Sequence, residues 1–304
     1  MSRTGAALST AFRPQTSGWV AIVLACLSPL VFAADPEPAA PSLSIDSEHS
    51  GVQRPLWELG VGLAGLRVPD YRGADQSSSY LLPLPYIVYR GTFLKADRDG
   101  ARALLLDTQR LKVDVSVAAS TPTRSRDNEA RQGMPNLPAV GEIGPNLNYT
   151  IAASVKDRWR LDVRLPLRAA VTLQRSPEFI GTTFSPHLNL DMGGLGGGWN
   201  LGMLTGPLFA DRKYHEHFYG VDPAYATSTR PAYQAHGGYA GWQALAATSR
   251  RFGNTWVGAF VRYDSLRGAS FEDSPLVRSR SAVTAGFGVS WILKTSSELV
   301  TSSD

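Results

Sequence analysis

Residues 159–167 read WRLDVRLPL, and apolar side chains occupy every odd-numbered position in this stretch. Arg160, Asp162 and Arg164 lie between them, and Arg168 continues the polar side. A period of two places the two sets on opposite faces of a β-strand. The same alternation recurs at 111–117, 142–151 and 283–293. The sequence therefore predicts an all-β fold.

The first residues indicate export. Arg3 and Arg13 precede an apolar run at 18–32, and small residues then allow cleavage after Ala33. The run is shorter than the roughly 20 residues that a membrane-spanning helix needs, so a cleaved secretory signal is predicted over 1–33. Cys26 loosely resembles a lipidation site, and this stays an alternative. It is the single Cys of the chain, so the mature protein is predicted to have no disulfide and no thiolate site.

The charge balance argues against nucleic-acid binding. The formal charge of +4 includes Arg3 and Arg13, and removing them leaves 28 basic against 26 acidic residues, a net of +2. A nucleic-acid-binding protein would carry a clustered basic excess. After the signal, no apolar stretch is long enough for a membrane helix, so a membrane location would require a β-barrel.

Composition divides the mature chain into three parts. Residues 34–55 are rich in Ala, Pro, Ser and acids and are predicted to be a flexible leader, residues 56–293 a single β domain, and residues 294–304 a polar tail. Twelve strands are predicted in the domain, at 56–69, 79–90, 91–98, 100–107, 110–121, 140–154, 158–174, 183–194, 197–211, 235–251, 254–268 and 280–293. Two of these, 91–98 and 100–107, are short, so ten strands is the alternative.

Short and long connections alternate along this domain. The long ones lie at 70–79, 121–140, 174–183, 211–235 and 268–280, and the connections between them are tight. The connection near Asp99 is the one exception to the alternation, because it is short where a long one is due. Outer-membrane barrels have short periplasmic turns and long extracellular loops. We therefore expect a transmembrane antiparallel up-and-down β-barrel in the outer membrane of a Gram-negative bacterium, surrounded by lipid, with both chain ends in the periplasm.

The polar faces of the strands would then line the lumen. The candidate lumen-lining residues are Glu142, Arg160, Asp162, Arg164, Arg168, His187, Asn189 and Asp191. They could form an ionic network that fills the lumen or a path that selects anions. Barrels of about eight strands are filled and those of about 16 are open, so twelve strands favour a narrow or filled lumen.

Other motifs do not support catalysis or cofactor binding. The glycines at 193–198 precede a strand and not a helix, which indicates a turn and not a phosphate-binding loop. His215 and His217 would share one face of an extended segment, but no third ligand accompanies them, so no metal site is assigned. His187 lies inside a predicted strand and Ser185 precedes it, but the sequence shows no pairing of a serine with a histidine, so no hydrolase site is assigned. No catalytic residue and no cofactor is predicted.

Several motifs resemble the MipA/OmpV family of outer-membrane proteins. They are PDYRGADQ at 69–76, LPLPY at 82–86, FLKADRDG at 93–100, ARQGMP at 130–135, EIGP at 142–145, YGV at 219–221, LRGA at 266–269 and SPLV at 274–277. The family-motif positions singled out are Pro69, Asp70, Tyr71, Arg72, Gly73, Lys95, Asp97, Arg98, Gly133, Met134 and Pro135. The resemblance covers residues 57–293.

The resemblance implies an outer-membrane protein without catalytic residues. One family member is described as a scaffold that joins a lytic murein transglycosylase to a bifunctional penicillin-binding protein, and others are treated as porins, osmoregulatory proteins or adhesins. A scaffold is therefore the leading hypothesis, with a narrow porin-like channel or a surface adhesin as alternatives. One departure is that Leu293 stands where barrels usually end on an aromatic residue, and eleven residues follow it.

Overall fold

The computed structural model describes residues 52–90, 94–97, 100–108 and 110–302, and it is built almost entirely from β-strands. In these described ranges, one α-helix, α1 (Arg212–Tyr219), and three single-turn 3₁₀ helices lie in the connections. The strands are β1 (Val52–Pro55), β2 (Trp57–Pro69), β3 (Ser77–Arg90), β4 (Leu94–Asp97), β5 (Gly100–Asp107), β6 (Leu111–Ser120), β7 (Val140–Ser154), β8 (Trp159–Thr172), β9 (Phe179–Phe184), β10 (His187–Leu195), β11 (Trp199–Ala210), β12 (Gly238–Phe252), β13 (Thr255–Ser265), β14 (Ser281–Thr295) and β15 (Leu299–Ser302). The all-β prediction is confirmed.

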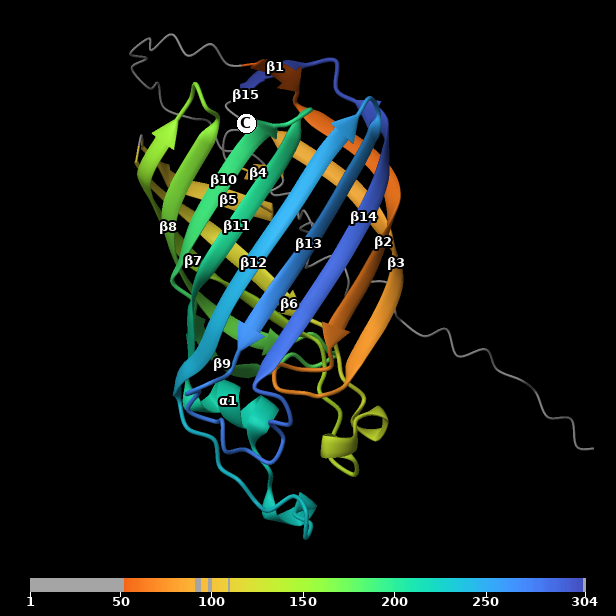
Figure 1. Ribbon diagram of the computed structural model, residues 1–304, viewed down its shortest axis with the longest axis vertical. Helices are drawn as coiled ribbons and strands as arrows, with labels where there is room; N and C mark the ends of the chain where they lie inside the picture. The colour runs from red at the N-terminus through yellow and green to blue at the C-terminus, as the bar shows by residue number, and fades with distance from the viewer. Residues whose placement is uncertain (1–51, 91–93, 98–99, 109, 303–304) are drawn as a thin grey trace, which may run out of the picture.

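Strands β2 to β14 belong to one antiparallel sheet in which neighbours in sequence pair with each other, with the exception of β9 and β10. The pairing also returns on itself, because β14 pairs with β2 and β10 pairs with both β8 and β11. Figure 1 shows these strands tilted around a common axis. We call this assembly the barrel-like sheet.

The predicted strand at 183–194 is interrupted. It appears as β9 and β10, separated by Ser185 and Pro186, and both halves pair with β8. Pro186 has no backbone N–H to donate, which accounts for a break in the ladder at this point.

The two faces of the barrel-like sheet differ in polarity. One face, here called the outer face, exposes large apolar side chains such as Val61 (55% exposed), Phe287 (60%) and Leu293 (66%). The opposite face, the inner face, carries the polar partners of the alternating strands. The alternation read from the sequence thus separates apolar from polar side chains as expected for period two.

The connections are segregated by length. Five long connections join strands at one end of the barrel-like sheet, where α1 lies in Figure 1, and we call this the loop end. They are residues 70–76, 121–139, 173–178, 211–237 and 266–280. The short turns lie at the other end, the turn end, together with β1 and β15. Strands β4 and β5, which pair with Asp97 opposite Gly100, are the exception to this alternation, as expected from the sequence.

The ends of the described chain pair with each other. Val52–Pro55, expected to belong to a flexible leader, forms β1 and pairs with β15 at Leu299–Ser302, within the expected polar tail. Strand β14 also continues past Leu293 to Thr295. Neither segment has the alternating sequence of a strand, because each of the two short strands forms only by pairing with the other. The predicted signal segment, the cleavage site at Ala33 and Cys26 lie outside the described residues.

The long connection after β11 contains a helix that the sequence reading missed. Asp211 caps α1 by accepting a hydrogen bond from the Tyr214 backbone N–H. The expectation that His215 and His217 share one face of an extended segment was therefore wrong, because residues two apart point in different directions on a helix with 3.6 residues per turn. No helix in the described ranges is long and apolar enough to cross a membrane.

Candidate functional site

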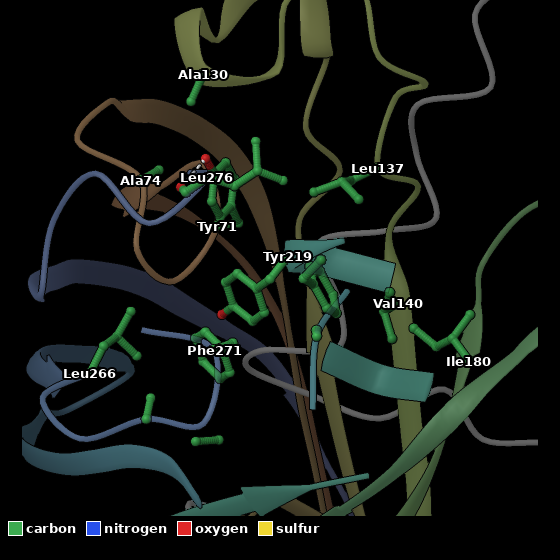
Figure 2. Close-up of a cluster of buried hydrophobic side chains, with 14 of the residues drawn as sticks. Tyr71, Ala74, Ala130, Leu137, Val140, Ile180, Tyr219, Leu266, Phe271 and Leu276 are labelled. Carbon is green, nitrogen blue, oxygen red and sulfur yellow. Dashed lines mark hydrogen bonds between the residues drawn. The ribbon is translucent and has the colours of Figure 1, made fainter. Parts of the chain in front are cut away.

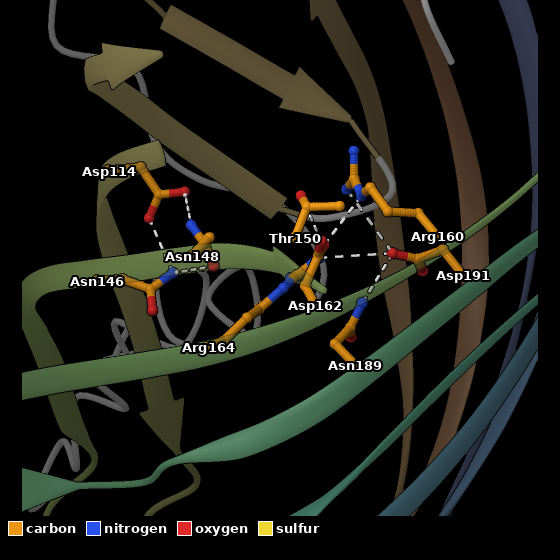
Figure 3. A network of polar contacts seen from close by, with 9 residues as sticks. All are labelled: Asp114, Asn146, Asn148, Thr150, Arg160, Asp162, Arg164, Asn189 and Asp191. Carbon is orange, nitrogen blue, oxygen red and sulfur yellow. Dashed lines mark hydrogen bonds and ion pairs between the residues drawn. The ribbon is translucent and has the colours of Figure 1, made fainter. Parts of the chain in front are cut away.

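Asp162 of β8 is buried at the centre of a polar network on the inner face (Figure 3). Arg160 Nε donates to its Oδ2 at 2.9 Å, and Thr150 Oγ1 of β7 donates to its Oδ1 at 2.8 Å. The Nη2 atom of Arg164 lies 3.8 Å from the same Oδ2. The carboxylate thus lies between two guanidinium groups, the arrangement that a buried charge requires.

Asp191 of β10 extends this network to the next strand. Its Oδ2 accepts a hydrogen bond from Asn189 Nδ2 at 2.7 Å and lies 3.5 Å from Arg164 Nη2 and 3.8 Å from Arg160 Nη2. The structure therefore brings together five of the eight candidate residues, namely Arg160, Asp162, Arg164, Asn189 and Asp191.

Glu142 and Arg168 form a second cluster nearer to the loop end. Arg168 Nη1 lies 3.9 Å from Glu142 Oε2, and its Nε and Nη2 donate to Ser116 Oγ on β6 at 2.9 and 2.7 Å. Glu142 also accepts hydrogen bonds from Thr183 Oγ1 and from Tyr214 OH of α1. This carboxylate thus connects the strand wall to the helix at the loop end.

His187, the remaining candidate, lies at the break between β9 and β10. Its Nδ1 is 2.7 Å from the backbone carbonyl oxygen of Ser185. A carbonyl oxygen is not a nucleophile, so this contact does not provide the hydroxyl–imidazole pair that a serine hydrolase needs. In the described part of the chain, no group of three or more His, Cys, Asp or Glu residues could hold a metal ion.

A polar cluster that was not singled out from the sequence joins β6 to β7. Asp114 is buried and accepts hydrogen bonds from Asn146 Nδ2 at 3.0 Å and from Asn148 Nδ2 at 2.8 Å. The signal was present, because all three residues occupy polar positions of alternating segments. What the sequence lacked was the register that places them opposite each other.

A second missed cluster lies at the turn end. Glu58 of β2 is 1% exposed; its Oε1 accepts a hydrogen bond from Arg90 Nη2 at 2.9 Å and its Oε2 one from Arg251 Nη1 at 2.6 Å. The two arginines lie on β3 and β12, far apart in sequence from each other. No local pattern indicates this triad.

At the loop end, the connections pack into a covering structure with its own hydrophobic core (Figure 2). We call residues 70–76, 121–139, 211–237 and 266–280 the loop cap. The rings of Tyr219 and Phe271 stack with centroids 3.7 Å apart, and Tyr71 OH donates to the Leu276 carbonyl oxygen at 2.7 Å. The cap is therefore an ordered packing of four connections and not a set of separate loops.

Two buried arginines tie the cap together through backbone carbonyl groups. Arg131 Nη1 donates to the Phe218 carbonyl oxygen at 3.0 Å, and Arg230 Nη1 donates to those of Ala130 and Gln132. Burial lowers the pKa of Arg131 to about 10, so the side chain stays charged at neutral pH.

His215 of α1 is buried in the cap core. Its Nδ1 donates to the His236 carbonyl oxygen at 2.6 Å, and its ring lies 4.5 Å from that of Phe271. Burial lowers the pKa of His215, and the contact with the His236 carbonyl only partly opposes this. Among the described residues the Nε2 atom has no hydrogen-bond partner, which fits a neutral ring.

With this geometry in view, comparison with known proteins gives a clear family assignment. A family model described as MltA-interacting protein MipA matches residues 61–293. The chain belongs to the MipA family. A comparison with curated proteins gives no match. Among solved structures, the chain is similar to a bacterial polysaccharide outer membrane secretin, with a TM-score of 0.43 and 10% identity over 78% of this chain and 99% of that chain.

In this MipA-family chain, residues Asp70 to Gly73 of the first motif lie in the loop cap. Pro69 ends β2, and Asp70 accepts hydrogen bonds from Ser78 Oγ and Asn128 Nδ2. Gly73 has a φ of +100°, a conformation that favours glycine, and its carbonyl oxygen accepts hydrogen bonds from two backbone N–H groups of the 266–280 connection.

Arg72 reaches back from this motif to the barrel-like sheet. Its Nε lies 3.1 Å from Oδ1 of the buried Asp264 on β13, and Arg262 Nη2 contacts the same oxygen at 2.8 Å. The motif therefore joins the cap to the inner face.

The motif positions Gly133, Met134 and Pro135 also lie in the cap. Gly133 has a φ of +79°, Met134 packs against the cap core, and the Pro135 carbonyl oxygen accepts a hydrogen bond from Ser125 Oγ at 2.6 Å. Lys95 and Asp97 belong to β4, and Arg98 lies outside the described residues. In this MipA-family chain the motif residues thus mainly build the loop cap, whereas the lumen-lining candidates belong to the strands.

Proposed function

We propose that this chain is a non-enzymatic outer-membrane barrel with a closed wall of twelve strands, counting β9 and β10 as one interrupted strand. The pairing of β14 with β2 and of β10 with β8 supports a closed wall. The half-exposed apolar side chains of the outer face support contact with lipid, since such a broad apolar surface is unfavourable in water.

We further propose that the barrel is a scaffold for enzymes that build and cleave murein. The observation that carries this proposal is the match to the MltA-interacting protein family over residues 61–293. The partners would be a lytic transglycosylase and, from the resemblance of the sequence, a penicillin-binding protein. They would dock at the turn end, which faces the periplasm in an outer-membrane barrel.

The inner face favours a scaffold over an open channel. Arg160 and Arg164 lie within 4.0 Å of Asp162 or Asp191, so their charges are already compensated. The packed loop cap adds a barrier to passage at the loop end of the barrel. A narrow anion-selective pore is the second candidate, supported by the same arginines.

The scaffold proposal is tested by recovering the tagged full chain from solubilised envelopes under mild crosslinking. A lytic transglycosylase is expected in the eluate, and its recovery should fall when the short turn at 155–158 is replaced by a Gly-Ser turn of equal length. A matched variant altered in the loop cap, Arg230→Ala, should leave recovery unchanged. If no murein enzyme co-purifies with the unaltered chain, the scaffold proposal is wrong.

The pore is tested by planar-bilayer recording of the purified chain. A filled lumen predicts no steady conductance. If a steady current does appear and Arg164→Ala changes its ion preference, the pore replaces the scaffold as the main function.

A further inference from the structure

A groove lies at the loop end, where α1 and the start of β9 are side by side (Figure 1). Its volume is about 770 Å³. Arg212, Lys213 and Glu216 of α1 line one side, and Glu178 and Phe179 line the other. Sites that bind small molecules or head groups have volumes of about 300–1,000 Å³. The groove is therefore large enough for a ligand bigger than a single ion.

The first turn of α1 places two cations in this groove. Arg212 and Lys213 follow the capping residue Asp211, and the turn contains no acidic side chain. The helix dipole makes the start of a helix unfavourable for cations. Arg212 Nη2 contacts Gln234 Oε1 at 3.4 Å, and in the described part of the chain neither cation forms an ion pair. Helix stability does not explain these side chains, whereas an anionic ligand would.

Two carboxylates line the same groove and differ in what they bind. Glu216 Oε2 accepts a hydrogen bond from the Ala235 N–H at 2.6 Å, so this side chain is held by the loop cap. The Glu178 side chain is exposed, and within the described ranges it forms no ion pair. A carboxylate accepts hydrogen bonds from hydroxyl groups. The groove thus offers two cations for an anionic group and an acceptor for hydroxyl groups.

Phe179 joins the groove to the outer face of the barrel-like sheet. Its ring is 46% exposed, and Lys213 Nζ lies 4.9 Å from the ring centroid. This cation–π contact holds the ammonium group at the border between the groove and the apolar outer face.

Further aromatic rings continue this part of the outer face near the loop end. Phe184 of β9 stacks on Phe209 of β11 at a centroid distance of 6.3 Å, and Phe209 contacts Tyr239 of β12 at 5.8 Å. Trp242 of β12 is 44% exposed. Aromatic girdles mark the membrane interfaces of outer-membrane barrels. The groove therefore lies at the level where lipid head groups would meet the barrel.

We propose that the groove binds the head group of a phosphorylated glycolipid in the outer leaflet of the membrane. The phosphate binds Arg212 and Lys213, sugar hydroxyl groups donate to Glu178, and the acyl chains run along the aromatic rings of the outer face. The groove volume and the free carboxylate favour a sugar over a phosphate alone. This inference rests on the proposed membrane barrel, because only there does the groove face lipid head groups.

The test is native mass spectrometry of the full chain in detergent micelles, titrated with diphosphoryl lipid A, an acylated disaccharide that carries two phosphates. One tightly bound molecule per chain is expected. Arg212→Gln combined with Lys213→Gln should weaken this binding about tenfold or more, since even one charge-assisted hydrogen bond contributes about tenfold. The matched control is Arg267→Gln combined with Lys294→Gln, which removes the same two charges from exposed positions outside the groove and should leave binding unchanged.

A second variant, Phe179→Ala, keeps both cations and removes the ring beside Lys213, so it should weaken binding about threefold. Lipid A without its phosphates and phosphatidylglycerol, which has a phosphate but no sugar, should each bind about tenfold more weakly than diphosphoryl lipid A. Equal binding of phosphatidylglycerol, or equal binding by the Arg212 and Lys213 double variant and its matched control, overturns the proposal.

Flotation with phosphatidylcholine vesicles in a density gradient separates this outcome from a failure of the barrel itself. A chain that floats with the vesicles but does not bind lipid A contradicts the glycolipid site alone. If the chain does not float, the proposed membrane barrel is wrong.

Discussion

Replacing Glu58 by glutamine removes the one negative charge of the turn-end triad while keeping the shape of the side chain. Glu58 is 1% exposed and Arg90 is 11% exposed, so this half of the triad is a buried pair. Arg251 is 40% exposed, and solvent screens its charge. Breaking a buried pair costs about 3–5 kcal/mol and an exposed pair about 0–1 kcal/mol. We expect the free energy of unfolding to fall by about 3 kcal/mol, mainly because the buried ion pair between Glu58 and Arg90 is lost.

The measurement is urea unfolding of the chain reconstituted in vesicles, followed by the mobility shift of unheated samples on gels. The matched control is Asp127→Asn, since Asp127 pairs with Arg126 but both side chains are exposed (60% and 75%). That change should shift the free energy of unfolding by less than about 0.5 kcal/mol. Equal, small losses in both variants would refute the view that burial of Glu58 makes its charge important.

Further predictions concern the cap and the inner face. The folded cap lowers the pKa of His215 from 6.5, so the opened cap binds the proton more tightly and cap stability should be lost as the pH falls below 6.5. The protection factors of the α1 amides, which are the exchange rates corrected for the intrinsic effect of pH, should therefore fall at acid pH, and less so in His215→Phe; protection factors that do not change with pH would contradict this. Gly286→Val places a Cβ 2.6 Å from Phe260 and should cost about 1–3 kcal/mol in urea unfolding, whereas Gly196→Ala, which meets nothing within 4 Å, should be near neutral. Phe271→Ala should destabilise the cap by about 3–5 kcal/mol, seen as rapid tryptic cleavage of the cap with an intact sheet, and unchanged cleavage would show that the cap does not depend on its core.

Strand positions could be predicted where wall strands such as β7 and β8 separate apolar from polar side chains with a period of two. The predicted 140–154 and 100–107 coincide with β7 and β5. The prediction failed where one residue changed the backbone chemistry, as at Pro186, or where a short capped helix interrupts a polar connection, as at Asp211. Such features depend on single residues and leave no periodic signal.

The sequence predicted which face of the sheet carries the candidate residues, but it did not predict which of these residues contact each other. Alternation places Arg164 on the polar face of β8, yet its contact with Asp191 depends on the register between β8 and β10. Glu58 and Arg251 are separated by 193 positions, and their pairing follows from the return of β14 to β2. The order of strands around the sheet is a long-range property that no local window contains.

The pairing of β1 with β15 brings the first and last described strands side by side, with Val52 opposite Ser302. A short peptide could therefore connect these positions without distorting the strands. A circular permutant opened instead at the exposed turn 155–158 should still fold, because a chain break is tolerated where few contacts cross it. The strand pairing around the wall would then be the same whether the polypeptide begins at β1 or at this turn.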